Sequence, residues 1–363
     1  MRFPGCQSAG KMIVRPAESP PLACSSMKNL LYSFCAIAGC LCAQPPDPLP
    51  SVTVGRVERM AAFPSQFVSA RNIDVWLPPG YDGTVRCPVI YMHDGQMLFD
   101  ASITWNKKSW QLAETAADLM RTGKIPRTII VGIWSNGPQR HSEYFPEKSL
   151  EFVPSDIREK FVRVALGGKP QADNYLRFLV KELKPAIDAR YATLPDRVHT
   201  IVMGSSMGGI ISLYAMCEYP EVFGAAGCLS THWEATFERN ATFPLAAFDY
   251  LEGHLPGPRD HRVYFDRGTA TLDALYSEAQ PFADVLFRER GYDDRNFQSR
   301  VFAGDEHTES AWAKRVAIPL EFLDGSSRLG FGETGKSGRV RGVRAAGCLS
   351  GTQADQSRNG RSD

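Results

Sequence analysis

The sequence predicts an α/β fold with a mostly parallel central sheet covered by helices on both faces. Between about residues 50 and 324, short apolar runs alternate with longer segments whose apolar residues recur at helical spacing. The short runs are almost continuously apolar, which is typical of strands buried on both faces of a parallel sheet. The chain has 363 residues, 43% of them hydrophobic, which is enough for one large core. We see no internal repeat and no linker in this span, so we expect one domain.

The expected strands begin with an antiparallel pair at 51–60 and 67–79. The other strands are expected, in chain order, at 87–94, 127–134, 197–203, 222–230, 261–266 and 297–304. Helices are expected between them, at 109–123, 171–191, 209–220, 272–291 and 310–323. Gly123 and Pro220 are helix stops, whereas Pro185 lies inside an expected helix. We expect 135–170 and 231–260 to be irregular excursions over the strand ends, where ligands bind in such sheets.

The two ends of the chain differ from the middle in composition. Residues 1–43 are interpreted as an upstream extension followed by a signal peptide that starts at Met27, because 27–43 has one lysine and an apolar run of signal-peptide length. Cleavage after Ala43 is one interpretation. The other is a lipobox at 37–40, which makes Cys40 a lipid anchor and the only link to a membrane. We therefore expect an exported protein, periplasmic or extracellular. Residues 44–324 form the expected domain, and the Gly-, Ser- and Arg-rich 325–363 is expected to be a disordered tail.

Charge and cysteine content exclude several classes of function. The formal net charge is +1, but residues 1–43 carry +3 and residues 326–363 carry +4, which leaves −6 for the rest. An acidic domain gives no support to nucleic-acid binding. Three of the nine cysteines, Cys87, Cys217 and Cys228, lie in apolar stretches of the domain and are expected to be core residues. We expect no metal and no cofactor, and the oligomeric state is open.

The stretch TIVMGSSMGG, residues 200–209, contains a candidate nucleophile. Ser206 is the centre of a G-x-S-x-G pattern whose glycines are Gly204 and Gly208. A serine at the apex of a sharp strand-to-helix turn needs small neighbours, because side chains there would clash with the strand and the helix. A β-branched run precedes the pattern and a helical one follows it, so the context fits. Ser205 does not fit, because Met203 stands where the first glycine belongs.

A serine nucleophile needs a histidine base and a carboxylate that orients the histidine. In the order Ser, acid, His, the best base is His307, in a polar loop between the last strand and the last helix. The acid should follow the strand 261–266, where Asp266 and Asp273 are both candidates. Asp266 ends the strand and is expected to brace the turn at Gly268, whereas Asp273 lies far enough into the loop to reach the histidine. Three other histidines after the serine are expected to be surface or pocket residues: His232, His254 and His261.

An oxyanion hole needs two backbone N–H groups directed at the developing negative charge. Met207 supplies one, at the start of a helix whose dipole also favours an anion. The second is expected in the loop after 87–94, where Gly95 permits close approach and Gln96 or Met97 offers the amide. Several aromatic residues are candidates either for a pocket that binds an aryl, siderophore or carbohydrate ester or for ordinary packing: Trp105, Trp110, Trp134, Tyr144, Phe145 and Trp233.

The blocks VIYMHDGQMLFD, VGIWSNGPQRHSEYFPEKSL, MGSSMGG, YFDRGTATLDALY and HTESAWAKR resemble the putative esterase family of α/β-hydrolases over about residues 50–324. This family includes S-formylglutathione hydrolase, feruloyl esterases, enterobactin-type esterases and mycolyltransferases. The resemblance implies a serine esterase of the α/β-hydrolase fold that acts on a small-molecule ester. It makes Ser206 the nucleophile, His307 the base, Asp273 the acid, and the amides of Gln96 and Met207 the oxyanion hole.

Two points stay open at this stage. The spacing from Gly268 to Asp273 is slightly longer than in S-formylglutathione hydrolase, so Asp266 remains the alternative acid. An acyltransferase would use the same triad with an acceptor alcohol in place of water. A non-catalytic binding protein of this fold would normally lack one triad residue, and all three are present in this sequence.

Overall fold

The computed structural model describes residues 47–325. The predictions of a signal peptide in 1–43, of a lipid anchor at Cys40 and of a tail beyond Gly325 concern segments outside these residues. Within the described span, no helix is both long and apolar enough to cross a membrane.

Eight strands form one sheet in the order β1-β2-β4-β3-β5-β6-β7-β8. β1 pairs antiparallel with β2, and β2 antiparallel with β4, whereas all other neighbours are parallel. The predicted mostly parallel sheet and its antiparallel opening pair are therefore confirmed. The strands are β1 (Arg56–Phe63), β2 (Arg71–Leu77), β3 (Val89–His93), β4 (Ile129–Ile133), β5 (Thr200–Ser205), β6 (Ala225–Leu229), β7 (Arg262–Arg267) and β8 (Phe297–Val301).

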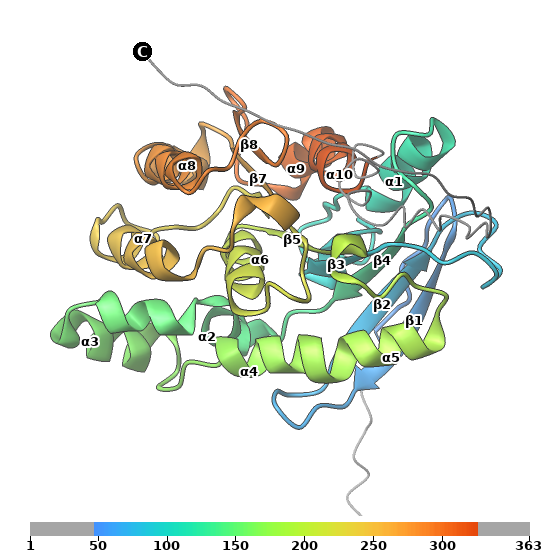
Figure 1. Ribbon diagram of the computed structural model, residues 1–363. Helices are drawn as coiled ribbons and strands as arrows, with labels where there is room; N and C mark the ends of the chain where they lie inside the picture. Colours follow the sequence, from blue (N-terminus) through green and yellow to red (C-terminus); the bar gives the residue numbers. More distant parts are fainter. Residues whose placement is uncertain (1–46, 326–363) are drawn as a thin grey trace, which may run out of the picture. The chain divides into compact units, whose positions relative to one another are not determined.

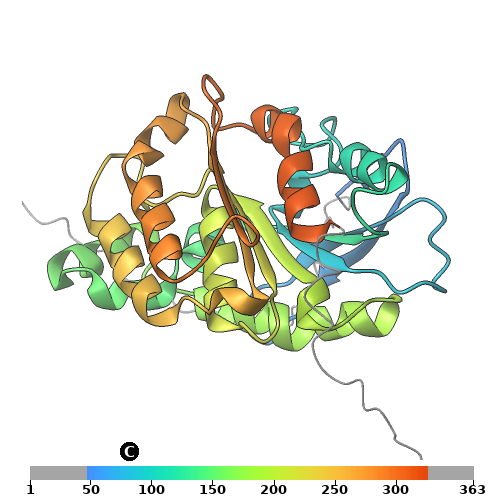
Figure 2. The same cartoon turned by 45° about the horizontal axis from the view of Figure 1, so that its top comes forward.

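Helices cover both faces of the sheet, as expected (Figures 1 and 2). Alternate residues of one strand enter different cores: Tyr91 of β3 packs in one cluster, and Met92 packs in the other. The Met92 side is covered by α1 (Leu112–Arg121), α9 (Glu309–Arg315) and α10 (Ala317–Asp324). The Tyr91 side is covered by α2 (Arg140–Tyr144), α3 (Ser155–Ala165), α4 (Ala172–Arg177), α5 (Lys184–Arg190), α6 (Met207–Glu218), α7 (Thr242–His254) and α8 (Ala279–Glu289). The three cysteines of the domain are free and buried in this core, as predicted.

Three expectations about the helices were wrong in detail. The segments 135–170 and 231–260 contain α2, α3 and α7, so they are not irregular. The helix expected at 171–191 is divided by a π-helical turn at Phe178–Leu183. Pro185 lies two residues after this turn and has no N–H to bond the carbonyl four residues before it, which explains the local change of helix type. The helix expected from 272 starts at Ala279, because Thr271–Ser277 forms a 3₁₀ turn.

This topology places the candidate residues at one edge of the sheet. Parallel pairing of each neighbouring pair gives the same direction to β3, β5, β6, β7 and β8. Their carboxyl ends therefore lie at the same edge of the sheet. The loops that follow these strands contain the candidate oxyanion amides, nucleophile, acid and base. Segments more than 200 residues apart in the chain are therefore brought to one edge.

Candidate active site

Ser206 lies at the turn between β5 and α6 with φ 58° and ψ −122°. A non-glycine residue with positive φ in this region is strained, which is typical of functional turns. The turn is fixed by a hydrogen bond from the Ser206 N–H to the Leu229 carbonyl, at 2.9 Å. A Cβ on Gly204 would lie 2.8 Å from the backbone carbon of Gly208, so only glycine fits there. Ser206 is partly exposed, whereas Ser205 is buried in β5.

The structure brings Asp273 and His307 together. Their Oδ1 and Nδ1 atoms are 2.5 Å apart. The other carboxylate oxygen of Asp273 accepts hydrogen bonds from the Ser230 hydroxyl, at 2.7 Å, and from the Gly268 N–H. Burial raises the pKa of Asp273, but the hydrogen bonds and the nearby His307 outweigh it and hold this pKa below its usual value. Asp273 is therefore a buried carboxylate aimed at one ring nitrogen of His307, and Nε2 remains available for another partner.

Asp266 occupies a different environment from the one we expected. The Gly268 N–H bonds to Asp273, so Asp266 does not brace that turn. Instead, Asp266 is fully buried and paired with Arg315, with Oδ1 and Nη2 3.0 Å apart. It also accepts a hydrogen bond from the Ser230 N–H at 3.3 Å. Burial raises the pKa of Asp266 to about 6 although Arg315 opposes this. No contact joins Asp266 to His307 within residues 47–325, so Asp273 is the acid that the geometry favours.

The amides of Gln96 and Met207 face no protein acceptor. Neither backbone N–H makes a hydrogen bond within residues 47–325. Met207 is the first residue of α6, where N–H groups have no partner inside the helix. The side chain of Gln96 is tied to Ser135 by two hydrogen bonds of 2.7 and 3.1 Å. Gly95 does permit a close approach, but of the backbone of Gly132, which a Cβ would meet at 2.4 Å.

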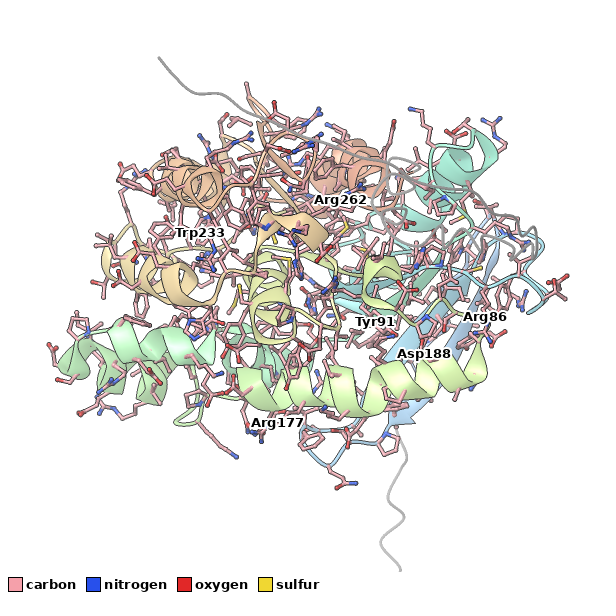
Figure 3. All side chains as sticks on the ribbon, in the orientation of Figure 1. Arg86, Tyr91, Arg177, Asp188, Trp233 and Arg262 are labelled. Atoms are coloured by element: carbon pink, nitrogen blue, oxygen red, sulfur yellow. The ribbon has the colours of Figure 1, made fainter. Side chains whose placement is uncertain are left out.

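Two of the residues predicted to bind substrate are part of the core. Tyr144 is 0% exposed and Trp233 1% exposed, so neither offers a surface to a ligand and both predictions were wrong. Trp233 lies between α7 and α8 (Figure 3), and its indole N–H bonds to Gln280. Trp110 and Phe145 are also buried and belong to ordinary packing.

The other two aromatic predictions differ from each other. Trp134 is half-buried, donates a hydrogen bond of 2.8 Å to Asp74, and lies under Arg59, whose guanidinium carbon is 4.6 Å from the ring centroid. Trp105 is 83% exposed in the loop after β3. Its neighbour Asn106 bonds to Glu309, two residues after His307. Of the four residues predicted to bind substrate, Trp105 is the most exposed.

Beside Ser206, Tyr276 was missed as a functional candidate, and His232, expected to be a surface or pocket residue, is buried. Tyr276 and His232 are buried, with the phenol oxygen 2.9 Å from Nδ1 of the imidazole. The backbone N–H of His232 donates a hydrogen bond of 3.2 Å to the backbone carbonyl of Ser206, which fixes this histidine beside the strand-to-helix turn. Tyr276 follows Asp273 by three residues in a 3₁₀ turn, a spacing that places both side chains on one side. That spacing was the sequence signal for Tyr276.

An ion pair lies at the end of β3, next to the same site. Arg140 binds Asp94 through two hydrogen bonds of 2.7 Å, and Asp94 has φ 55°. Burial raises the pKa of Asp94, but the charge and hydrogen bonds of Arg140 outweigh it and lower the pKa below its usual value. Burial lowers the pKa of His232 to about 3, and the positive charge of Arg140 makes a smaller contribution in the same direction. This pair was not anticipated, because its partners are 46 residues apart and belong to different loops.

Comparisons with known proteins agree with this architecture. The family model described as "Putative esterase" matches residues 65–319. The uncharacterized protein YbbA of Bacillus subtilis (strain 168) is 27% identical over 266 residues, which cover 71% of this chain and 94% of that protein. A solved ferulic acid esterase has a TM-score of 0.54 and 20% identity, covering 74% of this chain and 98% of its own. The enterobactin esterase FES from Shigella flexneri has a TM-score of 0.55 and 16% identity, covering 77% and 62%.

The family match spans well over half of the chain, and the sheet with its serine elbow has the order expected of an α/β-hydrolase. The chain therefore belongs to the "Putative esterase" family and is a carboxylic ester hydrolase.

Proposed function

We propose that this protein hydrolyses esters through a Ser-His-Asp triad and an acyl-enzyme intermediate. Ser206 attacks the ester carbonyl while His307 takes its proton at Nε2. Asp273 holds the proton of His307 on Nδ1 and stabilises the imidazolium that forms. The tetrahedral oxyanion accepts hydrogen bonds from the N–H groups of Gln96 and Met207. His307 then protonates the leaving alcohol, and water resolves the acyl-enzyme by the reverse sequence.

The observation that carries this proposal is the Asp273–His307 hydrogen bond at the same sheet edge as the Ser206 elbow. It accounts for the tautomer that a general base needs, because a proton fixed on Nδ1 leaves Nε2 free to accept another. A buried carboxylate with two further hydrogen-bond donors also stays ionised at neutral pH.

The test compares Ser206→Ala with Ser205→Ala. The first should abolish ester hydrolysis, because loss of a triad nucleophile costs on the order of 10⁶ in turnover. The second should stay active, since Ser205 is buried in β5. Circular dichroism and the melting temperature control for folding. An active Ser206→Ala variant would refute the proposal.

We propose an ester of an aromatic acid as the substrate class. One of the similar structures is described as a ferulic acid esterase, and ferulic acid is an aromatic carboxylic acid, which supports an aromatic acyl group. The indole of Trp105, 83% exposed in the loop after β3, offers a surface on which such a ring can stack. The test is a panel of acetyl, longer acyl, feruloyl and siderophore esters, with and without a sugar acceptor. Transfer of the acyl group to the sugar instead of water would identify an acyltransferase.

We also propose that residues 27–43 direct export, with the mature chain starting at Gln44, or at Cys40 if that cysteine is lipidated. The support is the charge and length of the apolar run. N-terminal sequencing of protein from expressing bacteria distinguishes the two starts. A mature chain that still carries Met27 would refute export.

A further inference from the structure

A serine side chain donates to the carboxylate oxygen of Asp273 that does not face His307. This is Ser230, whose hydroxyl lies 2.7 Å from Oδ2 of Asp273, beside the Gly268 N–H on the same oxygen. Ser230 directly follows β6, is 0% exposed and has a φ of 45°. Positive φ is strained in a residue other than glycine, and such strain is concentrated at functional sites. Ser230 is therefore a buried, strained serine in contact with the proposed acid.

Two other side chains fix the direction in which the Ser230 hydroxyl donates. The indole Nε1–H of Trp312 and an Nη2–H of Arg315 each donate to its oxygen over 2.9 Å. Both groups are donors only, whereas a hydroxyl has one proton and two lone pairs. The two lone pairs are occupied by these donors, so the proton is left for Asp273. The Ser230 hydroxyl is thus a fixed donor to the acid.

The same hydroxyl lies between the acid and a positive charge. Nη2 of Arg315 is 3.0 Å from Oδ1 of Asp266 but 3.8 Å from Oδ2 of Asp273, which is too long for a hydrogen bond. Arg315 therefore bonds Asp266 directly and reaches Asp273 through the Ser230 oxygen. A direct bond from arginine to a carboxylate is strong and would compete for the negative charge that stabilises the imidazolium of His307. Ser230 keeps that charge available to the base.

Trp312 connects this serine to the base. Its indole meets the imidazole of His307 edge-on, with the ring centroids 5.0 Å apart, while the N–H of the same indole bonds to Ser230. Ser230, Asp273, His307 and Trp312 therefore form a closed circuit of contacts. The orientation of the carboxylate and that of the imidazole are set together by this circuit.

We propose that Ser230 is a positioning residue of the triad, whose hydroxyl orients the carboxylate of Asp273 toward His307 and prevents Arg315 from pairing with it directly. The inference rests on the proposed roles of Ser206, Asp273 and His307. Ser230 exchanges no proton with the triad in this scheme and acts only through Asp273. Its effect belongs to the steps in which His307 becomes positively charged.

The experiment separates this role from a contribution to folding. We would measure kcat and KM for p-nitrophenyl acetate well below the thermal midpoint of each variant, with rates normalised to folded protein. The variants are Ser230→Ala, Asp273→Asn and the double variant. Ser149→Ala is the matched control, because Ser149 is a buried serine whose hydroxyl donates to the Pro146 carbonyl over 2.7 Å, outside this circuit.

We expect Ser230→Ala to lower kcat about tenfold with little change in KM, which is the lower end of what a hydrogen bond to a charged group contributes. Its melting temperature should also fall, because Trp312 and Arg315 lose an acceptor, but a purely structural role would leave the kcat of the folded protein unchanged. The double variant should be no slower than Asp273→Asn, because Ser230 acts only through the acid. Ser149→Ala should react like the wild type.

Two results would overturn the inference: a wild-type kcat in Ser230→Ala, or a double variant that is slower than Asp273→Asn by the same factor. If Ser230→Ala does not fold, Ser230→Cys takes its place, since a thiol fills the site but is a weak donor, and a wild-type kcat there would overturn the inference too. Ser206→Ala separates this failure from that of the proposed function. Inactive Ser206→Ala and Asp273→Asn variants beside a fully active Ser230→Ala variant would refute only the role of Ser230.

Discussion

Replacing Asp273 by asparagine should remove turnover through the tautomer of His307. One carboxylate oxygen of Asp273 faces the Gly268 N–H, a fixed donor, and the other faces His307 Nδ1. An asparagine must turn its amide oxygen to the Gly268 N–H, because two donors cannot face each other. Its NH₂ group then faces Nδ1, which has to accept. The proton of His307 moves to Nε2, and the histidine can no longer act as a base toward Ser206.

The expected loss is on the order of 10⁴ in kcat, the cost of the corresponding change in a serine protease. The matched variant is Asp266→Asn, which leaves His307 untouched and weakens the buried pair with Arg315. Arg315 keeps Asp305 as a partner at 2.9 Å, so we place the cost at about 2 to 3 kcal/mol, below the usual range for a broken buried pair. That corresponds to a fall in melting temperature of about 3 to 5 °C for a domain of this size.

The assay is kcat for p-nitrophenyl acetate together with the thermal midpoint of both variants. Asp273→Asn should be almost inactive, and Asp266→Asn should be destabilised but active when measured well below its midpoint. The opposite pattern, an inactive Asp266→Asn with an unchanged midpoint and a nearly silent Asp273→Asn, would reverse the assignment of the acid.

Three further changes probe other parts of the account. Gly204→Ala should abolish activity or folding, because its Cβ would lie 2.8 Å from the Gly208 backbone. The control is Gly253→Ala in α7, where no atom lies within 4 Å of the added Cβ, so thermal melts should show a neutral or stabilising effect. Glu234→Gln should change the pH dependence of the free energy of unfolding. Burial raises the pKa of Glu234 to about 7 in the folded protein, whereas in the unfolded chain its carboxyl group loses its proton from about pH 4. The wild type should therefore lose on the order of 2 kcal/mol of unfolding free energy from pH 4.5 to pH 8, and the variant less; equal losses in urea titrations would contradict this. Trp105→Ala should raise KM for feruloyl esters without changing the melting temperature, since its side chain is 83% exposed; an unchanged KM would remove Trp105 from the substrate site.

The sequence could predict the elbow because its cause is local. A Cβ on Gly204 would meet the backbone of Gly208, four residues further along the chain, and the flanking periodicity identified the strand and helix around Ser206. The order of apolar segments also predicted the parallel sheet. That sheet brings the loops containing Asp273 and His307 to one edge, so their meeting followed from topology.

Other features depend on packing between distant segments, and the sequence carries little trace of it. The burial of Tyr144 and Trp233 follows from how α2, α7 and α8 cover the sheet, not from their local pattern. The Asp266–Arg315 pair joins residues 49 apart, and no spacing rule connects them. The 3₁₀ turn that aligns Tyr276 with the acid replaced the first part of an expected helix.

The most direct test of the central claim is to locate the adduct of a serine-directed phosphonate. The protein is incubated with a p-nitrophenyl alkylphosphonate, digested, and sequenced by tandem mass spectrometry. We expect one adduct, on Ser206, which is absent from Ser206→Ala and forms far more slowly in His307→Ala. An adduct on Ser205, or an active enzyme that acquires none, would contradict the assignment of Ser206 as the nucleophile.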